Sequence, residues 1–579
     1  MEGNKKRVVA FKDYYDGKIE KCDTLPEGNE YDFLLERNKS HMRETALTFG
    51  KKNISFEELH EKIDEYARAL YHYGVRKGDH IGACVANTPE SVYLIYAINK
   101  LGAVMVGLSP LNNEYKMARD IEITKPKMIF SLDFMYSKFK KACEEYNIKP
   151  ILYSPLLSVN NPFLKGIYNI KQKKEGNHLS SKENRLDKII KSGRESDVEY
   201  SKHINGTCTN IMFTGGSSGV HKGVMLDGNG LNCVVKALDH VLLLEPGMVH
   251  LGNIPFGHMC FGRLVLHYVL CKNATYALTL KAMPQDFLDE MIRVHANGAM
   301  GGPVHWEALI DNPKLKKGCL NELIQPLSGG ELFKPQRLKQ ANEAIKFAGC
   351  KAEIGNGLGS TEMWAPTHVC VGGRNTPGTI GYEIPFVHSK IVDPKTFEEV
   401  QDGENGLLLV NGPGMMLEYF KNEKETESVF CFDENGTKWY NTKDIAKKLP
   451  TGEFEYIGRI KRNFVSGVDN IYPEQIEQLL LQIPEIREVA VTPIPDEHEQ
   501  HLPKYHISLS KEDCDKAKIE SSIVSIVGST LGKTALPGYI EYYENPLPRT
   551  DNGKLDTTLL CQKDIDSIEN KDMYRTDFR

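Results

Sequence analysis

Between residues 55 and 132 the sequence alternates between helical and extended patterns. The first helical segment begins with the capping-box sequence Ser55-Phe56-Glu57-Glu58, keeps apolar residues on one helical face as far as Leu70, and ends at Gly74. Three short apolar runs follow, at 80–85, 103–108 and 128–132. A second helical segment, which begins at Pro89, lies between the first two runs. Such alternation is typical of βαβ units. The sequence therefore predicts an α/β fold with mostly parallel sheets, and the pattern returns at 151–153 and 210–214.

Composition is that of a globular protein and excludes several functional classes. The chain has 579 residues, of which 40% are hydrophobic and 26% charged, with a formal net charge of −6. At about 150 residues per domain, this length predicts three or four structural units. The chain has no basic run of the nucleic-acid-binding type, and no segment of the sequence approaches the ~18 consecutive apolar residues of a membrane span. The first twenty residues lack the apolar core of a signal peptide, and the 13 cysteines include no C-x-x-C pair. We expect a cytoplasmic protein with reduced cysteines, no nucleic-acid partner and no membrane span.

The pattern changes in the C-terminal half. Residues from about 378 to 456 form short runs separated by turn signals such as Gly403-Glu404-Asn405-Gly406, which predicts a β-rich subdomain. After Gly458-Arg459 the pattern is mixed α and β again, and a helix begins at Tyr472-Pro473. We place a domain boundary at Lys461, so that 1–460 form a large N-terminal domain and 461–579 a small C-terminal domain.

One internal stretch departs from the alternation. Residues 165–205 are polar, irregular and rich in charge, which favours a solvated surface excursion. The short apolar segment 162–168 is also compatible with docking on a membrane or a partner, but its length makes that the weaker interpretation.

A glycine- and hydroxyl-rich loop follows the predicted strand Asn210-Ile211-Met212-Phe213. It runs Thr214-Gly215-Gly216-Ser217-Ser218-Gly219-Val220-His221-Lys222-Gly223. Glycines let backbone N–H groups approach an anion closely, and hydroxyl groups with a lysine complete a cradle for phosphates. The spacing differs from the common P-loop, G-x-x-x-x-G-K-[ST], because Lys222 comes later and is followed by Gly223. On the loop alone, a plain flexible turn is the alternative.

The order of residues in this loop resembles the phosphate loop of the adenylate-forming superfamily, which includes acyl-CoA synthetases, peptide-synthetase adenylation domains and luciferases. Further segments resemble motifs of that superfamily, in the same order along most of the chain: Leu327-Ser328-Gly329-Gly330-Glu331, Asn356-Gly357-Leu358-Gly359-Ser360-Thr361-Glu362, 378–385 in part, 440–444, 458–461, 466–473 and 548–554. Each is weak alone, but together they identify the chain as a member, of the acyl-CoA synthetase type. The resemblance implies a large N-terminal domain of stacked βαβ subdomains plus a β-rich subdomain, and a small mobile α+β C-terminal domain.

The resemblance also implies a role for each matched residue. Activation of a carboxylate by ATP joins two anions, so positive charge is needed at the α-phosphate. Lys554 would reach the α-phosphate and the attacking carboxylate, and Glu362 would hold Mg²⁺, a cation that prefers oxygen ligands. Asp444 would accept hydrogen bonds from the ribose hydroxyls, with Arg459 beside it. Outside such motifs, a lone glutamate or a lysine near a chain end is more often solvated.

The implied catalytic residues are Lys554, Thr214, Glu362 and Lys222. The implied ATP- and AMP-binding residues are Thr214, Gly215, Gly216, Ser217, Ser218, Gly219, Lys222, Gly330, Glu331, Asn356, Gly357, Leu358, Gly359, Ser360, Thr361, Asp444, Ile457, Arg459 and Lys554. Two half-reactions in one site require a rearrangement, for which the resemblance implies a hinge at Lys461. It implies that Ser466, Gly467 and Asn470 guide the pantetheine arm of CoA.

The expected acyl pocket contains His258, Gly301, Gly302, Gly329 and Gly357. An ordinary core histidine is the alternative for His258. The segment after His258 lacks the aspartate that amino-acid-activating relatives use to hold an α-ammonium group, which disfavours amino acids. Several small residues favour a fatty or other apolar acid.

Four residues depart from the family pattern. His221 stands where a proline precedes the loop lysine, and Leu358 where an aromatic residue stacks near adenine. Lys443 replaces a glycine before Asp444 and would be strained if φ there is positive. Val468 replaces the second glycine of the loop on the thiol side.

These observations support three hypotheses. The first is an AMP-forming acid–thiol ligase that uses ATP, Mg²⁺ and CoA. The second has the same chemistry but loads a free-standing acyl carrier protein. The third, motivated by the four departures, is a non-catalytic nucleotide-binding protein that retains the fold. Substitution of Lys554 by alanine would distinguish the third hypothesis from the first two. The oligomeric state is left open, with a homodimer as one option.

Overall fold

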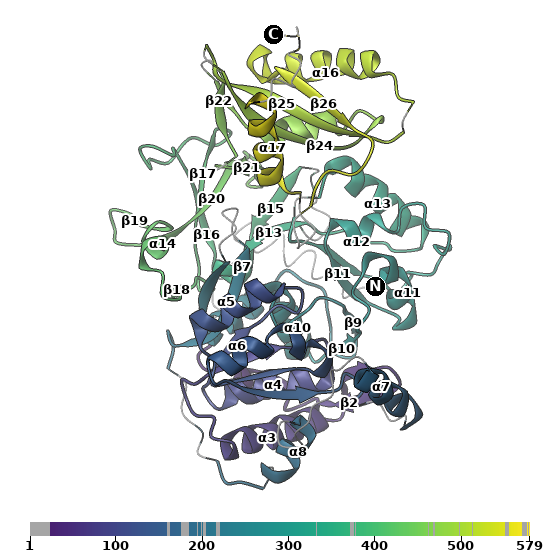
Figure 1. The fold of residues 1–579 in the computed structure, drawn as a ribbon, viewed down its shortest axis with the longest axis vertical. Helices are drawn as coiled ribbons and strands as arrows, with labels where there is room; N and C mark the ends of the chain where they lie inside the picture. The colour runs from purple at the N-terminus through teal and green to yellow at the C-terminus, as the bar shows by residue number, and fades with distance from the viewer. Residues whose placement is uncertain are drawn as a thin grey trace.

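The computed structural model describes residues 24–158, 162–174, 185–193, 195–198, 200, 204–215, 221–331, 333–370, 376, 378–460, 462–466, 469–496, 498–511, 513–549, 555–569, 576 and 578. Within these ranges the strands form four sheets. Figure 1 shows the last sheet and its helices at the top, above a larger body that contains the other three. The fold is therefore α/β, with a large N-terminal part of mixed sheets and a smaller C-terminal part, as the sequence predicted. Lys461 lies outside the described residues, so the boundary at that position stays a prediction.

A seven-stranded sheet carries the predicted βαβ units. Its order is β18-β8-β7-β4-β3-β5-β6, with β3 His80–Cys84, β4 Val104–Gly107, β5 Met128–Leu132, β6 Lys149–Tyr153, β7 Cys208–Gly215, β8 His221–Asp227 and β18 Glu418–Tyr419. Strands β7, β4, β3, β5 and β6 are parallel neighbours. Strand β8 runs antiparallel to β7, so the two strands that flank the glycine-rich loop lie side by side.

A six-stranded sheet has the order β12-β11-β9-β10-β1-β2. Its strands are β1 Thr45–Phe49, β2 Lys52–Ser55, β9 Val249–Gly252, β10 Thr275–Leu278, β11 Gly298–Gly301 and β12 Gln325–Ser328. All neighbours are parallel except the β1–β2 pair. Strands from two distant parts of the sequence, 45–55 and 249–328, therefore share one sheet.

Helices cover these two sheets. They are α2 Glu30–Asn38, α3 Phe56–His72, α4 Pro89–Lys100, α5 Glu114–Thr124, α6 Lys140–Glu145, α9 Gly228–Leu238, α10 Cys260–Cys271, α11 Phe287–Arg293, α12 Pro303–Glu307 and α13 Pro335–Phe347. Short 3-10 helices lie at η1 Asp133–Lys138, η3 Pro284–Asp286, η4 Thr361–Met363 and η5 Lys533–Ala535. Ser55 caps α3 at the predicted position, because its Oγ accepts a hydrogen bond of 3.1 Å from the Glu58 N–H. The Glu58 carboxylate contacts Lys52 Nζ at 2.9 Å.

The β-rich sheet is longer than the sequence predicted. Its strands are β13 Gly357–Ser360, β14 Ala365–Val369, β15 Thr379–Glu383, β16 His388–Val392, β17 Asn405–Asn411, β19 Phe430–Phe432, β20 Lys438–Lys448 and β21 Phe454–Arg459. It begins near 357 rather than 378, because the glycine-containing motif at 357–360 is itself a strand that pairs with β14. Helix α14 Glu423–Glu427 lies between β18 and β19 in the sequence.

The C-terminal part has a sheet of its own. Its strands are β22 Phe464–Ser466, β23 Asp469–Ile471, β24 Ile486–Asp496, β25 Gln500–Leu509 and β26 Tyr539–Tyr543, accompanied by α15 Pro473–Leu480, α16 Lys516–Leu531 and α17 Thr557–Glu569. Helix α15 begins with Pro473 at its first turn, where a missing N–H costs nothing.

The stretch 165–205, predicted to be irregular, contains two helices, α7 Pro162–Lys174 and α8 Leu186–Gly193. Helix α8 buries Leu186, Ile189 and Ile190 and packs against α3. The prediction of an irregular stretch is wrong for α8, because the apolar pattern of Leu186, Ile189 and Ile190 is short and its surroundings are polar. Among the described residues, no helix is both long and apolar enough to cross a bilayer.

A buried ion pair joins three elements of the N-terminal part. Glu30 on α2 contacts Arg263 on α10, and these side chains are 0% and 1% exposed. Glu30 Oε1 also accepts a hydrogen bond of 2.7 Å from Asn210 Nδ2 on β7. The Arg263 guanidinium lies over the ring of Tyr96 on α4, 4.7 Å from its centroid. One carboxylate thus links α2, α10 and β7.

We predict that Glu30→Gln destabilises the N-terminal part by about 3–5 kcal/mol, because the variant leaves the Arg263 charge buried without a counter-ion. The shift of the thermal and urea unfolding transitions measures this. The double variant Glu30→Gln/Arg263→Met, which removes both charges, should recover much of the loss. Equal stability of the Glu30→Gln variant and the wild type would contradict the prediction.

Candidate functional site

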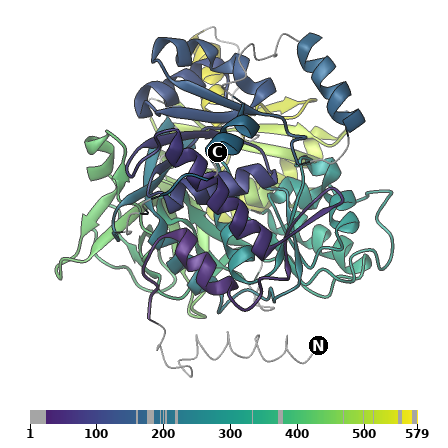
Figure 2. The ribbon, with the colours of Figure 1, turned by 90° about the horizontal axis from the view of Figure 1, so that it is seen from below.

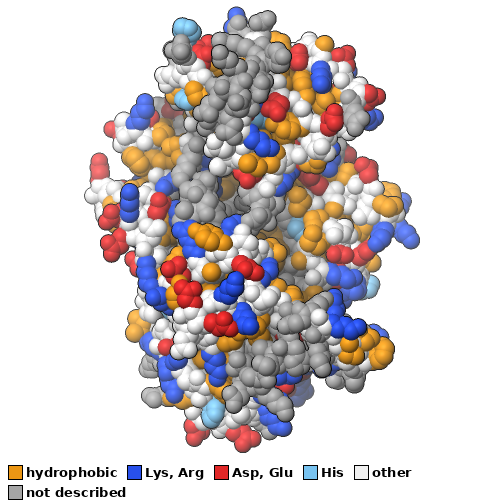
Figure 3. Space-filling model, viewed as in Figure 1, with side chains coloured by type: hydrophobic (Ala, Val, Ile, Leu, Met, Phe, Trp, Pro, Cys, Tyr) orange, Lys and Arg blue, Asp and Glu red, His pale blue; other side chains and the backbone are white. Residues whose placement is uncertain are grey.

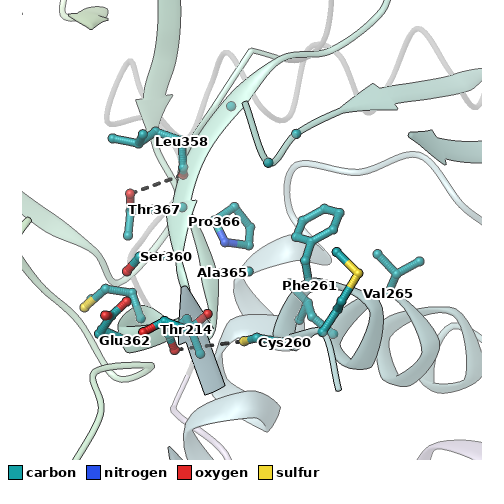
Figure 4. Close-up of a pocket in the computed structure, with 18 of the residues that line it drawn as sticks. Thr214, Cys260, Phe261, Val265, Leu358, Ser360, Glu362, Ala365, Pro366 and Thr367 are labelled. Carbon is teal, nitrogen blue, oxygen red and sulfur yellow. Dashed lines mark hydrogen bonds between the residues drawn. The ribbon is translucent and has the colours of Figure 1, made fainter. Parts of the chain in front are cut away.

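A cavity of about 570 Å³ is lined by residues from three sheets and two helices of the N-terminal part. One side is polar and is lined by Thr214, Lys222, Gly330, Asn356, Gly357, Leu358, Gly359, Ser360, Thr361, Glu362, Tyr419, Tyr440, Thr442, Lys443, Asp444 and Arg459. The other side is mostly apolar and includes Leu238, Leu242, Phe261, Leu264, Val265, Met300 and Leu327. Figure 4 shows both sides, with Glu362, Thr214 and Ser360 across from Phe261 and Val265, and Ala365 and Pro366 between them.

The β7–β8 pairing brings two of the predicted phosphate-binding residues together. Thr214 on β7 is the register partner of Lys222 on β8. Side chains of directly opposed residues in an antiparallel pair point to the same face. A hydroxyl and an ammonium group therefore reach the cavity from adjacent strands. Gly215 ends β7, whereas Gly216, Ser217, Ser218 and Gly219 lie outside the described residues.

Lys222 already has an anionic partner. Its Nζ lies 2.5 Å from Glu425 Oε2 on α14 and 4.8 Å from the centroid of the Tyr419 ring. The Lys222 side chain is 14% exposed and that of Glu425 is 40% exposed. A negatively charged ligand that reaches Lys222 must therefore compete with a partly solvated carboxylate.

Glu362 lies on η4 and is 8% exposed. Its Oε1 accepts a hydrogen bond of 2.8 Å from the Tyr419 hydroxyl, and its backbone oxygen accepts one of 2.7 Å from the Met416 N–H. Burial, together with the nearby Glu362 carboxylate, raises the pKa of Tyr419, so the phenol stays a donor. The carboxylate is thus held in place at the polar wall of the cavity.

Asp444 and Arg459 form a second fixed pair. They are register partners on β20 and β21, and Arg459 Nε lies 2.7 Å from Asp444 Oδ1. The Asp444 carboxylate raises the pKa of the Arg459 guanidinium. Asp444 is 3% exposed, and its N–H donates to Thr442 Oγ1 at 3.1 Å. Both residues line the cavity, as their predicted roles require.

Lys443, one of the four departures, has φ of +61°. The backbone therefore has the left-handed conformation that favours glycine, and the lysine is strained. Two hydrogen bonds compensate in part: Lys443 Nζ lies 3.2 Å from Ser428 Oγ, and the Lys443 backbone N–H donates to Asn441 Oδ1 at 2.9 Å. Lys443 also adds a positive charge to the cavity lining.

Several buried polar atoms in the cavity lining lack a described partner, and two of them lie on the polar side. Asn356 Oδ1 and Ser360 Oγ are buried and have no hydrogen-bond partner among the described residues. A buried polar group without a partner is costly, so such atoms mark a place where a ligand or water binds. Thr214, Lys222, Ser360 and Arg459 supply donors in this lining that fit a phosphate-bearing ligand, whereas Asn356 Oδ1 accepts a hydrogen bond. The Glu362 carboxylate fits a hard divalent cation.

His258 lines the cavity. Burial lowers the pKa of His258 to about 4, so the ring is neutral at pH 7. Gly329 and Gly357 also line the cavity, but Gly301 and Gly302 are not among the lining residues, and Met300 beside them is. Gly301 instead packs against His305, where an added Cβ would come within 2.7 Å of the His305 Cβ.

The remaining predicted residues lie elsewhere. Ile457 is 1% exposed in the core of the β-rich sheet, and Glu331 is not among the residues that line the cavity. Ser466 is buried in β22, where its Oγ lies 3.4 Å from Glu499 Oε2. Asn470 lies on β23. The other candidates fall outside the described residues: Lys461, Gly467, Val468 and Lys554.

Sequence reasoning missed several lining residues. Tyr419 lies in the lining, and Glu425 pairs with Lys222 without being a lining residue itself. Both follow the phosphate loop by about 200 residues, and no spacing rule connects them to Lys222. Gln325 and His250 lie on buried strands that sequence patterns assign to the core. Only the strand register shows that they face the cavity together.

Comparison with known proteins assigns the chain to a class. The model of the AMP-binding enzyme family matches residues 34–420, and that of the AMP-binding enzyme C-terminal domain matches residues 475–554. The first match alone covers more than half of the chain, so the chain belongs to the AMP-binding enzyme family. The predicted membership of the adenylate-forming superfamily is confirmed.

Relatives of known function match almost the whole chain. A long-chain-fatty-acid–CoA ligase of Bacillus subtilis (strain 168) is 26% identical over 94% of this chain and 96% of its own length. The mitochondrial medium-chain acyl-CoA ligase of Danio rerio is 24% identical, over 88% of this chain and 84% of its own. A luciferin 4-monooxygenase of Photuris pensylvanica is 24% identical over 90% and 94% of the two chains.

Solved structures share the fold. The anthranilate CoA ligase AuaEII in complex with anthranoyl-AMP has a TM-score of 0.79 at 19% identity, over 94% of this chain and 99% of that one. ATP-bound MatB from Rhodopseudomonas palustris has a TM-score of 0.78 at 20% identity, over 92% and 99% of the two chains. At these identities the likeness defines the fold and no more.

We predict that Lys443→Gly stabilises the protein by up to about 1 kcal/mol, because glycine relieves the left-handed strain but gains entropy when unfolded. Thermal unfolding measures the change. Lys443→Ala is the matched control, since it removes the charge but keeps the strain, and it should not stabilise. A destabilised Lys443→Gly variant would show that the contact with Ser428 outweighs the strain.

We predict that Glu425→Gln strengthens ATP binding up to about fivefold, since a partly exposed ion pair contributes at most about 1 kcal/mol. Isothermal calorimetry with ATP and Mg²⁺ measures it. Glu427→Gln on the same helix α14 is the control and should leave the affinity unchanged. Unchanged or weaker binding by Glu425→Gln would mean that Glu425 does not compete with the nucleotide.

Proposed function

We propose that this protein is an AMP-forming acid–CoA ligase that activates an acid with an apolar body. The observation that carries the proposal is the single cavity, in which a donor-rich wall with Thr214, Lys222 and Arg459 continues into an apolar pocket lined by α10. Membership of the AMP-binding enzyme family and acyl-CoA ligases among the relatives support it. We place the reaction in the cytoplasm, as part of the same proposal.

In the first half-reaction, a carboxylate oxygen of the acid attacks the α-phosphorus of ATP, and pyrophosphate leaves. Thr214 and Lys222 would hold the terminal phosphates, and the Asp444–Arg459 pair would orient the ribose. Glu362 would hold Mg²⁺, which supplies neutralisation of the phosphate charge when bound. The neutral His258 would shape the junction between the acyl pocket and the phosphate side.

In the second half-reaction, the CoA sulfur attacks the acyl carbonyl carbon, the thiol proton passes to solvent, and AMP leaves. We propose that rotation about Lys461 exchanges Lys554 for the Ser466–Asn470 side of the C-terminal part between the two steps. Glu331 and Ile457 do not line the cavity, so we propose that they act only as its support.

Two polar side chains, His250 and Gln325, also line the cavity, and they bear on which acid the protein would bind. His250 on β9 and Gln325 on β12 are both register partners of Gly298 on β11, so the three residues form one row across the sheet. Gly298 leaves room between the two side chains, and an added Cβ there would lie 2.6 Å from His250 Cδ2. His250 and Gln325 both line the cavity.

The hydrogen bonds in this row fix what each side chain offers. Gln325 Oε1 accepts from the Leu243 N–H at 2.6 Å, so the amide nitrogen remains as a donor, and it is buried without a described partner. His250 Nδ1 lies 2.9 Å from the Leu251 oxygen and must donate to it, which leaves Nε2 as an acceptor. Burial lowers the pKa of His250 to about 4, so the ring is neutral. We propose that the row binds a hydroxyl group on the far part of the acid, because a hydroxyl both donates and accepts.

The proposed function is tested by pyrophosphate release from ATP and Mg²⁺ with fatty, hydroxy-fatty and aromatic acids, each with and without CoA. Release that depends on the acid and rises with CoA, together with acyl-CoA detected by mass, supports the ligase. Release without acyl-CoA would favour an acyl carrier protein as acceptor. No release with any acid, in a protein that still binds ATP, would favour the non-catalytic alternative.

We predict that Lys554→Ala lowers acid-dependent pyrophosphate release by roughly 10²–10³-fold, because the developing charge loses its cation. ATP binding by calorimetry serves as the control and should change far less. Turnover that survives the substitution unaltered would show that the catalytic assignment is wrong.

We predict that Gln325→Leu lowers kcat/KM for an ω-hydroxy fatty acid about 3- to 10-fold relative to the unsubstituted acid of equal length, since one neutral hydrogen bond contributes ~0.5–1.5 kcal/mol. Octanoate and its terminally hydroxylated counterpart form a suitable pair. Gln336→Leu, on the surface of α13, is the control and should leave the ratio unchanged. An unchanged ratio in Gln325→Leu would reject the polar row as a determinant of substrate.

A further inference from the structure

Helix α7 presents its apolar face to solvent. Phe163, Ile167 and Ile170 follow one another at helical spacing and are 74%, 50% and 61% exposed. Residues at this spacing lie on one face of a helix. In an ordinary surface helix such a stripe faces the core, so its exposure here requires an explanation. We call Phe163, Ile167 and Ile170 the outer stripe.

The helix is attached through its other face. Lys165 Nζ donates a hydrogen bond of 2.9 Å to the Leu157 oxygen, and the Tyr168 hydroxyl donates to Asp133 on η1. Gln172 is 7% exposed. Lys165, Tyr168 and Gln172 also share a helical face, opposite the outer stripe. The polar side of α7 is thus fixed to the protein, which sets the orientation of the outer stripe.

The figures show how far α7 stands out. It lies at the edge of the molecule in Figure 1, and in the view turned by 90° it again projects from the body. Figure 3 shows apolar and basic side chains gathered at this corner of the surface. The outer stripe is therefore placed to meet a flat surface without a clash with the rest of the protein.

The charge of the helix is uniformly positive. Residues 162–174 contain four lysines and no acidic residue, although the whole chain has a net charge of −6. Lys171 and Lys174 are exposed in the same half of the helix as Ile170. A partner of complementary chemistry therefore has a negatively charged surface and an apolar interior.

We propose that α7 docks on an anionic lipid bilayer. Amphipathic helices with lysines beside an apolar face lie in the plane of a membrane interface, with the apolar face ~5–10 Å deep and the lysines at the headgroups. A stable protein interface buries about 800 Å² on each partner, more than three side chains on one short helix supply. The outer stripe is thus sufficient for reversible membrane contact but small for a dimer of this chain. This inference does not depend on the proposed activity, although apolar acids do concentrate in bilayers.

The test is flotation of the full-length protein with vesicles of phosphatidylcholine containing 30% phosphatidylglycerol, compared with vesicles of phosphatidylcholine alone. We expect the wild type to float with the anionic vesicles at low salt and to bind at least tenfold less well to neutral ones or in high salt. Phe163→Ser/Ile167→Ser/Ile170→Ser should reduce binding to the anionic vesicles at least tenfold. Lys171→Gln/Lys174→Gln should reduce it and weaken its salt dependence.

A matched control removes the same kind of surface elsewhere. Phe347, Phe397 and Phe432 are 57%, 46% and 68% exposed. Replacement of these three by serine should leave vesicle binding unchanged. Thermal unfolding and ATP binding of every variant verify that the fold is intact, and both are independent of vesicles.

Three outcomes overturn the proposal. If the wild type does not float with anionic vesicles, α7 does not bind membranes. If the outer-stripe variant instead converts a wild-type dimer to a monomer by light scattering, with no vesicle binding in the wild type, the stripe is an interface between two copies. Equal loss of vesicle binding in the control and the outer-stripe variants would also overturn it, because the effect would then be general surface hydrophobicity.

Discussion

The buried carboxylate of Glu30 links elements that line the candidate cavity. It pairs with Arg263 on α10 and accepts from Asn210 on β7. Strand β7 leads to Thr214, and α10 carries Phe261 and Val265 on the cavity wall. The polar and apolar sides of one cavity are therefore connected, through residues that do not line it, by a single buried ion pair. Removing one partner of such a pair is costly, so the relative position of β7 and α10 is strongly constrained.

Strand register carries this constraint into the site. Thr214 and Lys222 are opposed on β7 and β8, and Asp444 and Arg459 on β20 and β21. His250 and Gln325 flank Gly298 in one row of the six-stranded sheet. A slip of one residue in any of these pairings would turn a cavity-facing side chain to the opposite face. The site thus depends on ladder geometry more than on loops.

The fold class, most strands of the seven-stranded sheet and the family could be predicted from the sequence, because period-2 and helical patterns and the order of motifs are local signals. The predicted conflict at Lys443 is present, with φ of +61°. The start of the β-rich sheet and helix α8 were missed, since short apolar patterns were outweighed by glycine and by polar composition. Gly301 and Gly302 were expected in the acyl pocket, but they are not among the residues that line the cavity. Contacts such as Lys222–Glu425 join residues about 200 positions apart and leave no local trace.

The contact between Lys222 and Glu425 also sets a threshold for ligands. Lys222 already contacts the Glu425 carboxylate, and a singly charged anion would have to displace it. Binding of such an anion therefore releases little free energy. A polyphosphate chain brings several negative charges close to Lys222. Its replacement of Glu425 is therefore more favourable in free energy than replacement by a lone phosphate. In the proposed reaction, departure of pyrophosphate returns Lys222 to Glu425. Lys222 would then again have a carboxylate partner within the protein.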